Sequence, residues 1–320
     1  MKLTLEDLKK ITFGALEINE ENGRFSFERF TKEQREYYSR VRPDFMKKVG
    51  STASVMMDFY TDSSELSFIY ESEVGSGASY CFFDVYVDGC LTLHEGSDGN
   101  SRVSGGASLA LAEGKKRIQI YLPLLERGYI SELTLKDGGY RQVNKTKKAL
   151  IYGDSITQGY YAHYPSLSYA NIIARELELD AINQGIGAEH FNPGMVGTTP
   201  ICDPALITVA YGTNDWHHES FTREEVEAHA RDFFLNLRAL YPKARIVYIT
   251  PIWRRDYMTD TSVGGFLEIS KVYADYARAA EIDVVDGMTL TAHFGGLFTD
   301  GLHPNDLGFT QFASALMKHL

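Results

Sequence analysis

The sequence predicts an α/β protein in which a smaller β-sandwich domain precedes a parallel sheet covered by helices on both faces. Residues 51–135 contain short runs of β-branched and aromatic residues that are broken by Gly, Ser and Asp. From residue 149 onward, continuous apolar runs alternate with amphipathic helical patterns. A polar, basic stretch at 141–148 separates these two patterns. We therefore expect two domains, a β-rich N-terminal domain at 1–146 and an α/β domain at 147–320.

The runs of the first domain have the length and spacing of antiparallel strands. They are residues 54–60, 66–70, 81–87 and 117–122. Asp88-Gly89 follows the third run directly and is a hairpin turn signal. The stretch 96–106 is rich in Gly and Ser and indicates a loop. Several short strands at this spacing are typical of a sandwich.

The second domain alternates strand and helix patterns. Apolar runs at 149–153, 205–212 and 245–250 are followed by helical patterns at 168–179, 222–240 and 265–280. A capping-box pattern, Thr222-Arg223-Glu224-Glu225, opens the second of these helices. This alternation predicts a parallel sheet, and ligands of such sheets bind beyond the carboxyl ends of the strands.

The charge of the chain restricts its partners. A net charge of −11 argues against nucleic acid and anionic membrane surfaces. Residues 147–320 carry 13 basic and 21 acidic side chains, against 19 and 22 in residues 1–146, so the second half is the more acidic. We therefore expect a neutral substrate rather than a polyanionic one.

The sequence favours a cytoplasmic protein. It contains no run of about 18 apolar residues, which a transmembrane helix would need. The charged residues Glu6, Asp7, Lys9 and Lys10 fall where a secretory signal would have its apolar core. The three cysteines form no CxxC pair and are expected to be free thiols.

Neither a cofactor nor a metal is expected. Gly185 and Gly187 lack the third glycine of a dinucleotide-binding loop. His217 and His218 are adjacent, so their side chains diverge, and no third ligand is evident in the sequence.

Three short pieces of the second domain carry the groups that acyl transfer needs. Residues 153–157 offer the hydroxyl of Ser155, and residues 212–215 offer the side-chain amide of Asn214. Residues 300–303 offer a carboxylate and an imidazole three positions apart. A nucleophile, a base, a carboxylate that orients the base and oxyanion donors are the parts of a serine hydrolase site.

In the order and content of these pieces, the second domain resembles the SGNH (GDSL-type) hydrolases, a family of esterases and deacylases with a flavodoxin-like, three-layer fold. The matching motifs cover residues 149–320. The resemblance implies that Ser155 is the nucleophile, His303 the base and Asp300 its orienting carboxylate. It also implies that the Ser155 N–H and Asn214 donate to the oxyanion.

Each residue also has a structural alternative. Ser155 would serve as a helix N-cap, and Asn214 would cap the turn that follows it. Asp300 and Gly301 would form an ordinary turn, with His303 at the surface. Jointly, in this order and spacing, the catalytic interpretation is favoured.

A further stretch, Asn183 to Ala188, resembles the family's second block, in which a glycine supplies an oxyanion N–H. Ala188 stands where that glycine is expected, and it can serve if its φ angle is negative. Gly187, just before it, is a candidate substrate-binding residue. Trp253, at a strand end, either forms a stacking wall for a sugar ring or is a core aromatic. Phe191 and Met195 are further pocket candidates.

These observations predict a serine esterase that removes small acyl groups, such as acetyl, from a carbohydrate or similar polar alcohol. Acetyl and carbohydrate specificity rest on the resemblance, which extends to two-domain bacterial carbohydrate esterases. The alternatives are a lipase, lysophospholipase or thioesterase acting on longer chains, and a non-catalytic glycan-binding protein. The expected partner is a small-molecule or oligosaccharide ester, and the first domain is a candidate for an oligomer contact.

Overall fold

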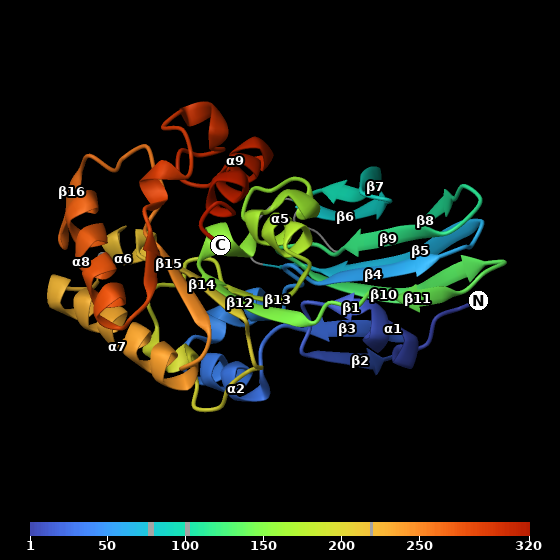
Figure 1. Ribbon diagram of the computed structural model, residues 1–320, viewed down its shortest axis with the longest axis horizontal. Helices are drawn as coiled ribbons and strands as arrows, with labels where there is room; N and C mark the ends of the chain where they lie inside the picture. The colour runs from blue at the N-terminus through green and yellow to red at the C-terminus, as the bar shows by residue number, and fades with distance from the viewer. Residues whose placement is uncertain (76–79, 100–102, 218–219) are drawn as a thin grey trace.

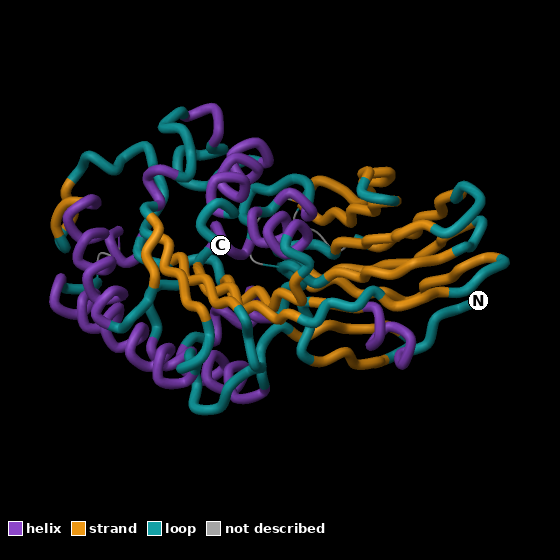
Figure 2. Tube along the Cα trace, in the orientation of Figure 1, coloured by secondary structure: helices purple, strands orange, loops and turns teal. Residues whose placement is uncertain are grey.

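The computed structural model describes residues 1–75, 80–99, 103–217 and 220–320. Over these residues the chain forms one parallel sheet at one end and two antiparallel sheets that extend from it (Figures 1 and 2). No helix among them is long and apolar enough to cross a membrane.

The parallel sheet has five strands in the described part of the chain, in the order β13-β12-β14-β15-β18. The strands are β12 (Lys147–Gly153), β13 (Leu179–Gly185), β14 (Leu206–Ala210), β15 (Arg245–Ile249) and β18 (Asp283–Val285). Every neighbouring pair is parallel, so their carboxyl ends meet at one edge. The predicted parallel sheet is confirmed.

Helices cover both faces of this sheet (Figure 1). Along β12, Leu150 and Tyr152 face one buried cluster while Ala149 and Ile151 face another, as the two-residue repeat of a strand requires. The first cluster also contains residues of α7 (Arg223–Leu240) and α8 (Phe266–Ala279), and the second contains residues of α5 (Tyr169–Glu176) and α9 (Asp306–Leu316). The predicted capping box at Thr222 is present at the start of α7.

The first cluster receives side chains from the N-terminal part of the chain as well. Tyr38 of α2 (Lys32–Val41), Phe45 of a short 3₁₀ turn and Val49 of α3 (Met46–Val49) pack into it. This segment therefore lies against the same layer as α7 and α8, and Figure 1 shows α2 beside α7.

Two antiparallel sheets occupy the other end of the molecule. One has the order β2-β3-β10-β5-β8, and the other β1-β4-β9-β6-β7 with β11 paired to β4. Their residues jointly form one buried cluster, which supports the predicted sandwich. The strands are β1 (Thr12–Phe13), β2 (Glu17–Glu21), β3 (Arg24–Glu28), β4 (Met56–Thr61), β5 (Glu65–Glu73), β6 (Tyr80–Val87), β7 (Cys90–Asp98), β8 (Ser104–Ala110), β9 (Lys116–Tyr121), β10 (Arg127–Lys136) and β11 (Tyr140–Gln142).

The hairpin turn predicted at Asp88-Gly89 is confirmed, and the loop predicted at 96–106 is wrong in part. Asp88 and Gly89 both have positive φ, 48° and 80°, as the tight β6–β7 hairpin requires. The stretch 96–106, expected to be a loop, belongs to β7 up to Asp98 and to β8 from Ser104. Small residues there satisfy close strand pairing: a Cβ on Gly96 would lie 1.9 Å from the Cys81 carbonyl oxygen.

The remaining short elements connect these layers. They are α1 (Leu5–Ile11), α4 (Ser155–Gln158), α6 (Thr213–His217) and the β16–β17 ribbon (Asp260–Thr261 and Gly264–Gly265).

Candidate active site

Ser155 lies directly beyond the carboxyl end of the central strand β12. The strand ends at Gly153, where a Cβ would lie 1.9 Å from Thr157 Oγ1, so only glycine permits this tight strand-to-helix turn. Asp154 caps α4 by accepting the Ile156 N–H at 2.9 Å, and Ser155 is the first helical residue. The alternative interpretation of Ser155 as the N-cap is therefore wrong, and its hydroxyl is left for another partner.

That partner is His303. Ser155 Oγ lies 2.7 Å from His303 Nε2, and His303 Nδ1 lies 2.8 Å from Asp300 Oδ2. The other carboxylate oxygen of Asp300 accepts the backbone N–H groups of Leu302 at 2.9 Å and His303 at 2.8 Å. Asp300 thus both forms the turn that the structural alternative proposed and orients the imidazole. The structure brings the serine, histidine and aspartate together.

The protonation states suit proton transfer from the serine. Burial lowers the pKa of His303 and outweighs the opposing effect of Asp300, so the imidazole is neutral near pH 7. Burial raises the pKa of Asp300, but the hydrogen bonds from His303 and Leu302 outweigh it and hold that pKa below its ordinary value. A charged carboxylate therefore faces a neutral imidazole.

Asn214 lies on α6, just after β14, on the same edge of the sheet as Ser155. Its side-chain nitrogen donates to the Glu189 carbonyl oxygen at 2.8 Å. A side-chain amide has two N–H bonds, so one remains for a substrate oxygen. The bond to Glu189 also ties Asn214 to the loop that carries Ala188.

The second block differs from expectation in one respect. Ala188 has φ 64°, so the condition set for it in the sequence analysis, a negative φ angle, is not met. The φ angle describes rotation about the N–Cα bond of Ala188. This rotation does not redirect the Ala188 N–H, because that N–H lies in the peptide plane that Ala188 shares with Gly187. The Gly187 N–H is already donated to Gln158 Oε1 at 2.7 Å, whereas the Ala188 N–H has no hydrogen bond to any described residue. Of the two, Ala188 is therefore the available donor.

Two tyrosines that the sequence analysis did not single out lie beside the imidazole. The ring centroids of Tyr160 and Tyr161 are 5.3 and 5.5 Å from that of His303. Tyr80, from β6, in turn contacts Tyr161 at 6.5 Å between centroids. All three side chains are partly exposed, and together they form an aromatic wall beside His303. Tyr80 comes from an antiparallel sheet, and Tyr160 and Tyr161 come from the segment that follows α4. Two consecutive tyrosines five residues after the nucleophile were the available sequence signal.

The other candidates occupy less direct positions. Trp253 is 8% exposed and packs 4.8 Å from Phe298 between ring centroids, which fits its core alternative better than a stacking wall. Phe191 and Met195 are fully buried in the cluster beneath α7 and α8. A Cβ on Gly187 would lie 3.8 Å from Ser155 Cβ, so this glycine borders the nucleophile.

No metal-binding cluster of three or more His, Cys, Asp or Glu side chains occurs in the described ranges. His217 is exposed at the end of α6. His218 lies outside the described residues.

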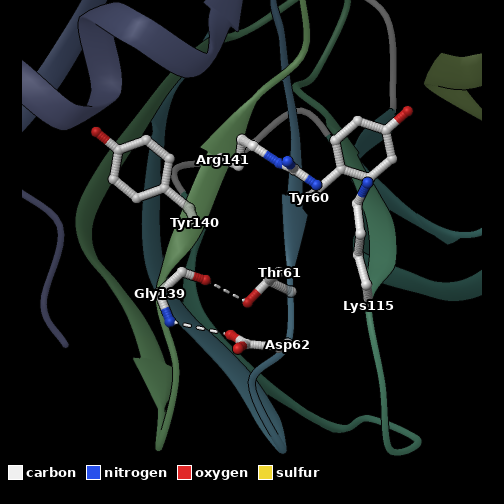
Figure 3. Close-up of a pocket in the computed structure, with 7 residues that line it drawn as sticks. All are labelled: Tyr60, Thr61, Asp62, Lys115, Gly139, Tyr140 and Arg141. Carbon is white, nitrogen blue, oxygen red and sulfur yellow. Dashed lines mark hydrogen bonds between the residues drawn. The ribbon is translucent and has the colours of Figure 1, made fainter.

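A cavity of about 350 Å³ lies away from this site, on the antiparallel strands (Figure 3). In it, the Lys115 ammonium lies 4.0 Å from the centroid of the Tyr60 ring. Its lining residues are Tyr60, Thr61, Asp62, Lys115, Gly139, Tyr140 and Arg141.

Residues 151–310, half of the chain, match the GDSL-like lipase/acylhydrolase family. No curated protein matches the chain.

Several solved structures share its fold. A salicylyl-acyltransferase from a tetracycline biosynthetic pathway is 20% identical with a TM-score of 0.83, and the match covers 99% of this chain and 96% of that one. A family two carbohydrate esterase from Clostridium thermocellum, in complex with cellohexaose, is 17% identical with a TM-score of 0.64, covering 84% and 92%. An acetyl xylan esterase from the rumen bacterium Butyrivibrio proteoclasticus is 17% identical with a TM-score of 0.60, covering 83% and 89%.

Proposed function

We propose that this chain, which belongs to the GDSL-like lipase/acylhydrolase family and is an ester hydrolase, acts as a serine esterase that removes small acyl groups, acetyl above all, from a carbohydrate or similar polar alcohol. The observation that carries the proposal is the continuous hydrogen-bond chain from Ser155 through His303 to Asp300. It supplies a nucleophile, a neutral base and an orienting carboxylate at one edge of the sheet.

In the proposed reaction, Ser155 Oγ attacks the ester carbonyl carbon while its proton passes to His303 Nε2. The carbonyl oxygen becomes an oxyanion that accepts hydrogen bonds from Asn214 Nδ2 and from the backbone N–H groups of Ala188 and Ser155. His303 then gives the proton to the departing alcohol, which leaves an acyl-enzyme. Water, deprotonated by His303, then attacks that ester. As the bond to Ser155 Oγ breaks, His303 returns the proton to the serine and the acid is released.

The aromatic wall supports a sugar as the alcohol. Sugar rings present apolar C–H faces, and Tyr160 and Tyr161 offer ring surfaces next to His303, where the leaving alcohol must take up its proton. The fold shared with carbohydrate esterases agrees with this choice without deciding it. We retain the division into a sandwich domain at 1–146 and a hydrolase domain at 147–320, and the cytoplasmic location, as parts of this proposal.

Hydrolysis of p-nitrophenyl acetate and of acetylated xylo-oligosaccharides by the purified chain tests the function. Ser155→Ala should abolish both activities, whereas Ser314→Ala, which changes an exposed serine on α9, should change neither. Normal turnover by Ser155→Ala would remove the basis of the assignment.

The same assay decides between the alternatives. Octanoyl esters turned over much faster than acetyl esters would favour a lipase or thioesterase. Binding of the acetylated oligosaccharide without any hydrolysis by the wild-type chain would favour a glycan-binding protein.

A further inference from the structure

A lysine from the N-terminal part of the chain contacts the loop that carries the proposed oxyanion donor. Lys48, on α3, donates from its ammonium to the carbonyl oxygen of Gly187 at 2.6 Å. The two residues are 139 positions apart, so this contact exists only because α3 packs against the layer of α7 and α8.

The contact fixes the direction of the neighbouring N–H. In a trans peptide the C=O of one residue and the N–H of the next lie in one plane and point in opposite directions. A hydrogen bond to the Gly187 carbonyl therefore makes the Ala188 N–H point in the opposite direction, away from Lys48. The same bond is charge-assisted, and a cation on the carbonyl oxygen draws electron density from the peptide and strengthens its N–H as a donor.

The peptide on the other side of Gly187 is also held. The Gly187 N–H donates to Gln158 Oε1 at 2.7 Å, and Gln158 Nε2 donates to Ser51 Oγ at 3.0 Å. Beyond Ala188, the Glu189 carboxylate accepts the Tyr38 hydroxyl at 2.5 Å. Ala188 lies between these anchors with φ 64°, a conformation that non-glycine residues adopt only when their surroundings impose it.

The surroundings of Lys48 place its ammonium at this peptide. Its backbone carbonyl accepts the guanidinium of the fully buried Arg29 at 3.0 Å, and its ammonium lies 4.3 Å from the centroid of the Phe45 ring. No carboxylate forms an ion pair with Lys48 within the described ranges of the chain. Its one hydrogen-bond acceptor there is Gly187.

We propose that Lys48 is a positioning residue that orients and polarises the Gly187–Ala188 peptide, so that the N-terminal part of the chain completes the oxyanion hole of the C-terminal part. The inference rests on the proposed function. It requires that the ammonium stabilise the transition state more than the bound substrate, so its loss should reduce kcat and leave KM nearly unchanged.

Three variants separate this role from a purely structural one. Lys48→Met keeps the length of the side chain but removes the charge and the donor, Lys48→Arg keeps both, and Lys47→Met changes an exposed neighbour on the same helix. With p-nitrophenyl acetate, Lys48→Met should reduce kcat about 10- to 100-fold, below the loss of a direct oxyanion donor. Lys48→Arg should recover most of that loss, and Lys47→Met should match the wild type.

A spectroscopic measurement separates the positioning role from misfolding of the variant and from an absence of esterase activity. In ¹⁵N-labelled protein, the Ala188 amide resonance should shift in Lys48→Met, return toward its wild-type position in Lys48→Arg and stay in place in Lys47→Met. An unchanged kcat or an unmoved Ala188 resonance in Lys48→Met would overturn the inference, as would loss of native fold in that variant without recovery in Lys48→Arg. Absence of ester turnover in the wild type, with the resonance shift present, would count against the proposed function and for the positioning role.

Discussion

Replacing Asp300 with asparagine isolates the contact that orients the catalytic imidazole. Asp300 Oδ1 accepts two backbone N–H groups, from Leu302 at 2.9 Å and His303 at 2.8 Å, and the asparagine oxygen can keep both bonds. Its NH₂ group then replaces Oδ2, 2.8 Å from His303 Nδ1. The opposite orientation would point the NH₂ group at two N–H donors, so the turn itself selects this one.

The consequence is the wrong tautomer. An amide donor facing Nδ1 requires the ring proton to reside on Nε2, which then donates to Ser155 Oγ instead of accepting its proton. A loss of this kind reduces kcat about 10⁴-fold, or about 5 kcal/mol of transition-state stabilisation. Asp300 also raises the pKa of His303 against the lowering effect of burial, so in the variant that pKa should fall further.

The assay is p-nitrophenyl acetate hydrolysis between pH 4 and 9, with Asp275→Asn, an exposed aspartate on α8, as the matched control. For Asp300→Asn we expect a loss of about 10⁴-fold in kcat and an unchanged unfolding temperature. The rising limb of the residual pH–rate profile should move to lower pH. The control should resemble the wild type. A loss of less than tenfold, or a rising limb moved to higher pH, would refute the role given to Asp300.

Three further outcomes follow from the same contacts. In the wild type, kcat/KM should rise to its plateau with a midpoint below about 6.5, because only neutral His303 accepts a proton and burial lowers its pKa; a midpoint above 7 would contradict this. Asn214→Ala should reduce kcat about 10²- to 10³-fold with little change in KM, and an equal rise in KM would instead indicate substrate binding. Arg29→Met should lower the free energy of unfolding by about 3 kcal/mol or more in chemical denaturation, because the buried carbonyls of Ser51 and Asn183 lose their donor; a change below about 1 kcal/mol would exclude this role.

The parts of the fold that the sequence predicted are those with local patterns. Continuous apolar runs predicted β12, β14 and β15, because both faces of a buried parallel strand contact apolar layers and its residues are therefore apolar on both sides. The capping box at Thr222 predicted the start of α7. Asp88-Gly89 predicted a hairpin, because both residues tolerate the positive φ angles of its turn.

The packing of α2 and α3 onto the hydrolase half left no comparable pattern. The contacts of this segment, from Arg29 just before α2 to Lys48 on α3, join residues more than a hundred positions apart: Arg29 to Asn183, and Lys48 to Gly187. A buried arginine or a lysine on a carbonyl looks in the sequence like any surface cation, because only tertiary structure supplies the acceptor.

The candidate site divides in the same way. Asp300 and His303 fall in one turn, so their contact was predictable from spacing, whereas Ser155 meets them across 148 positions and was placed by motif order and resemblance. The left-handed conformation of Ala188 was not predictable, because non-glycine residues disfavour it and only the surrounding anchors hold it.

A crystal structure of the chain after reaction with a phosphonate ester tests the central claim most directly, since the tetrahedral phosphorus adduct mimics the attacked carbonyl. We predict phosphorus bonded to Ser155 Oγ, with one of its oxygens about 3 Å from both Asn214 Nδ2 and the Ala188 nitrogen. Modification of another residue, or an adduct whose oxygens face neither donor, would contradict the account.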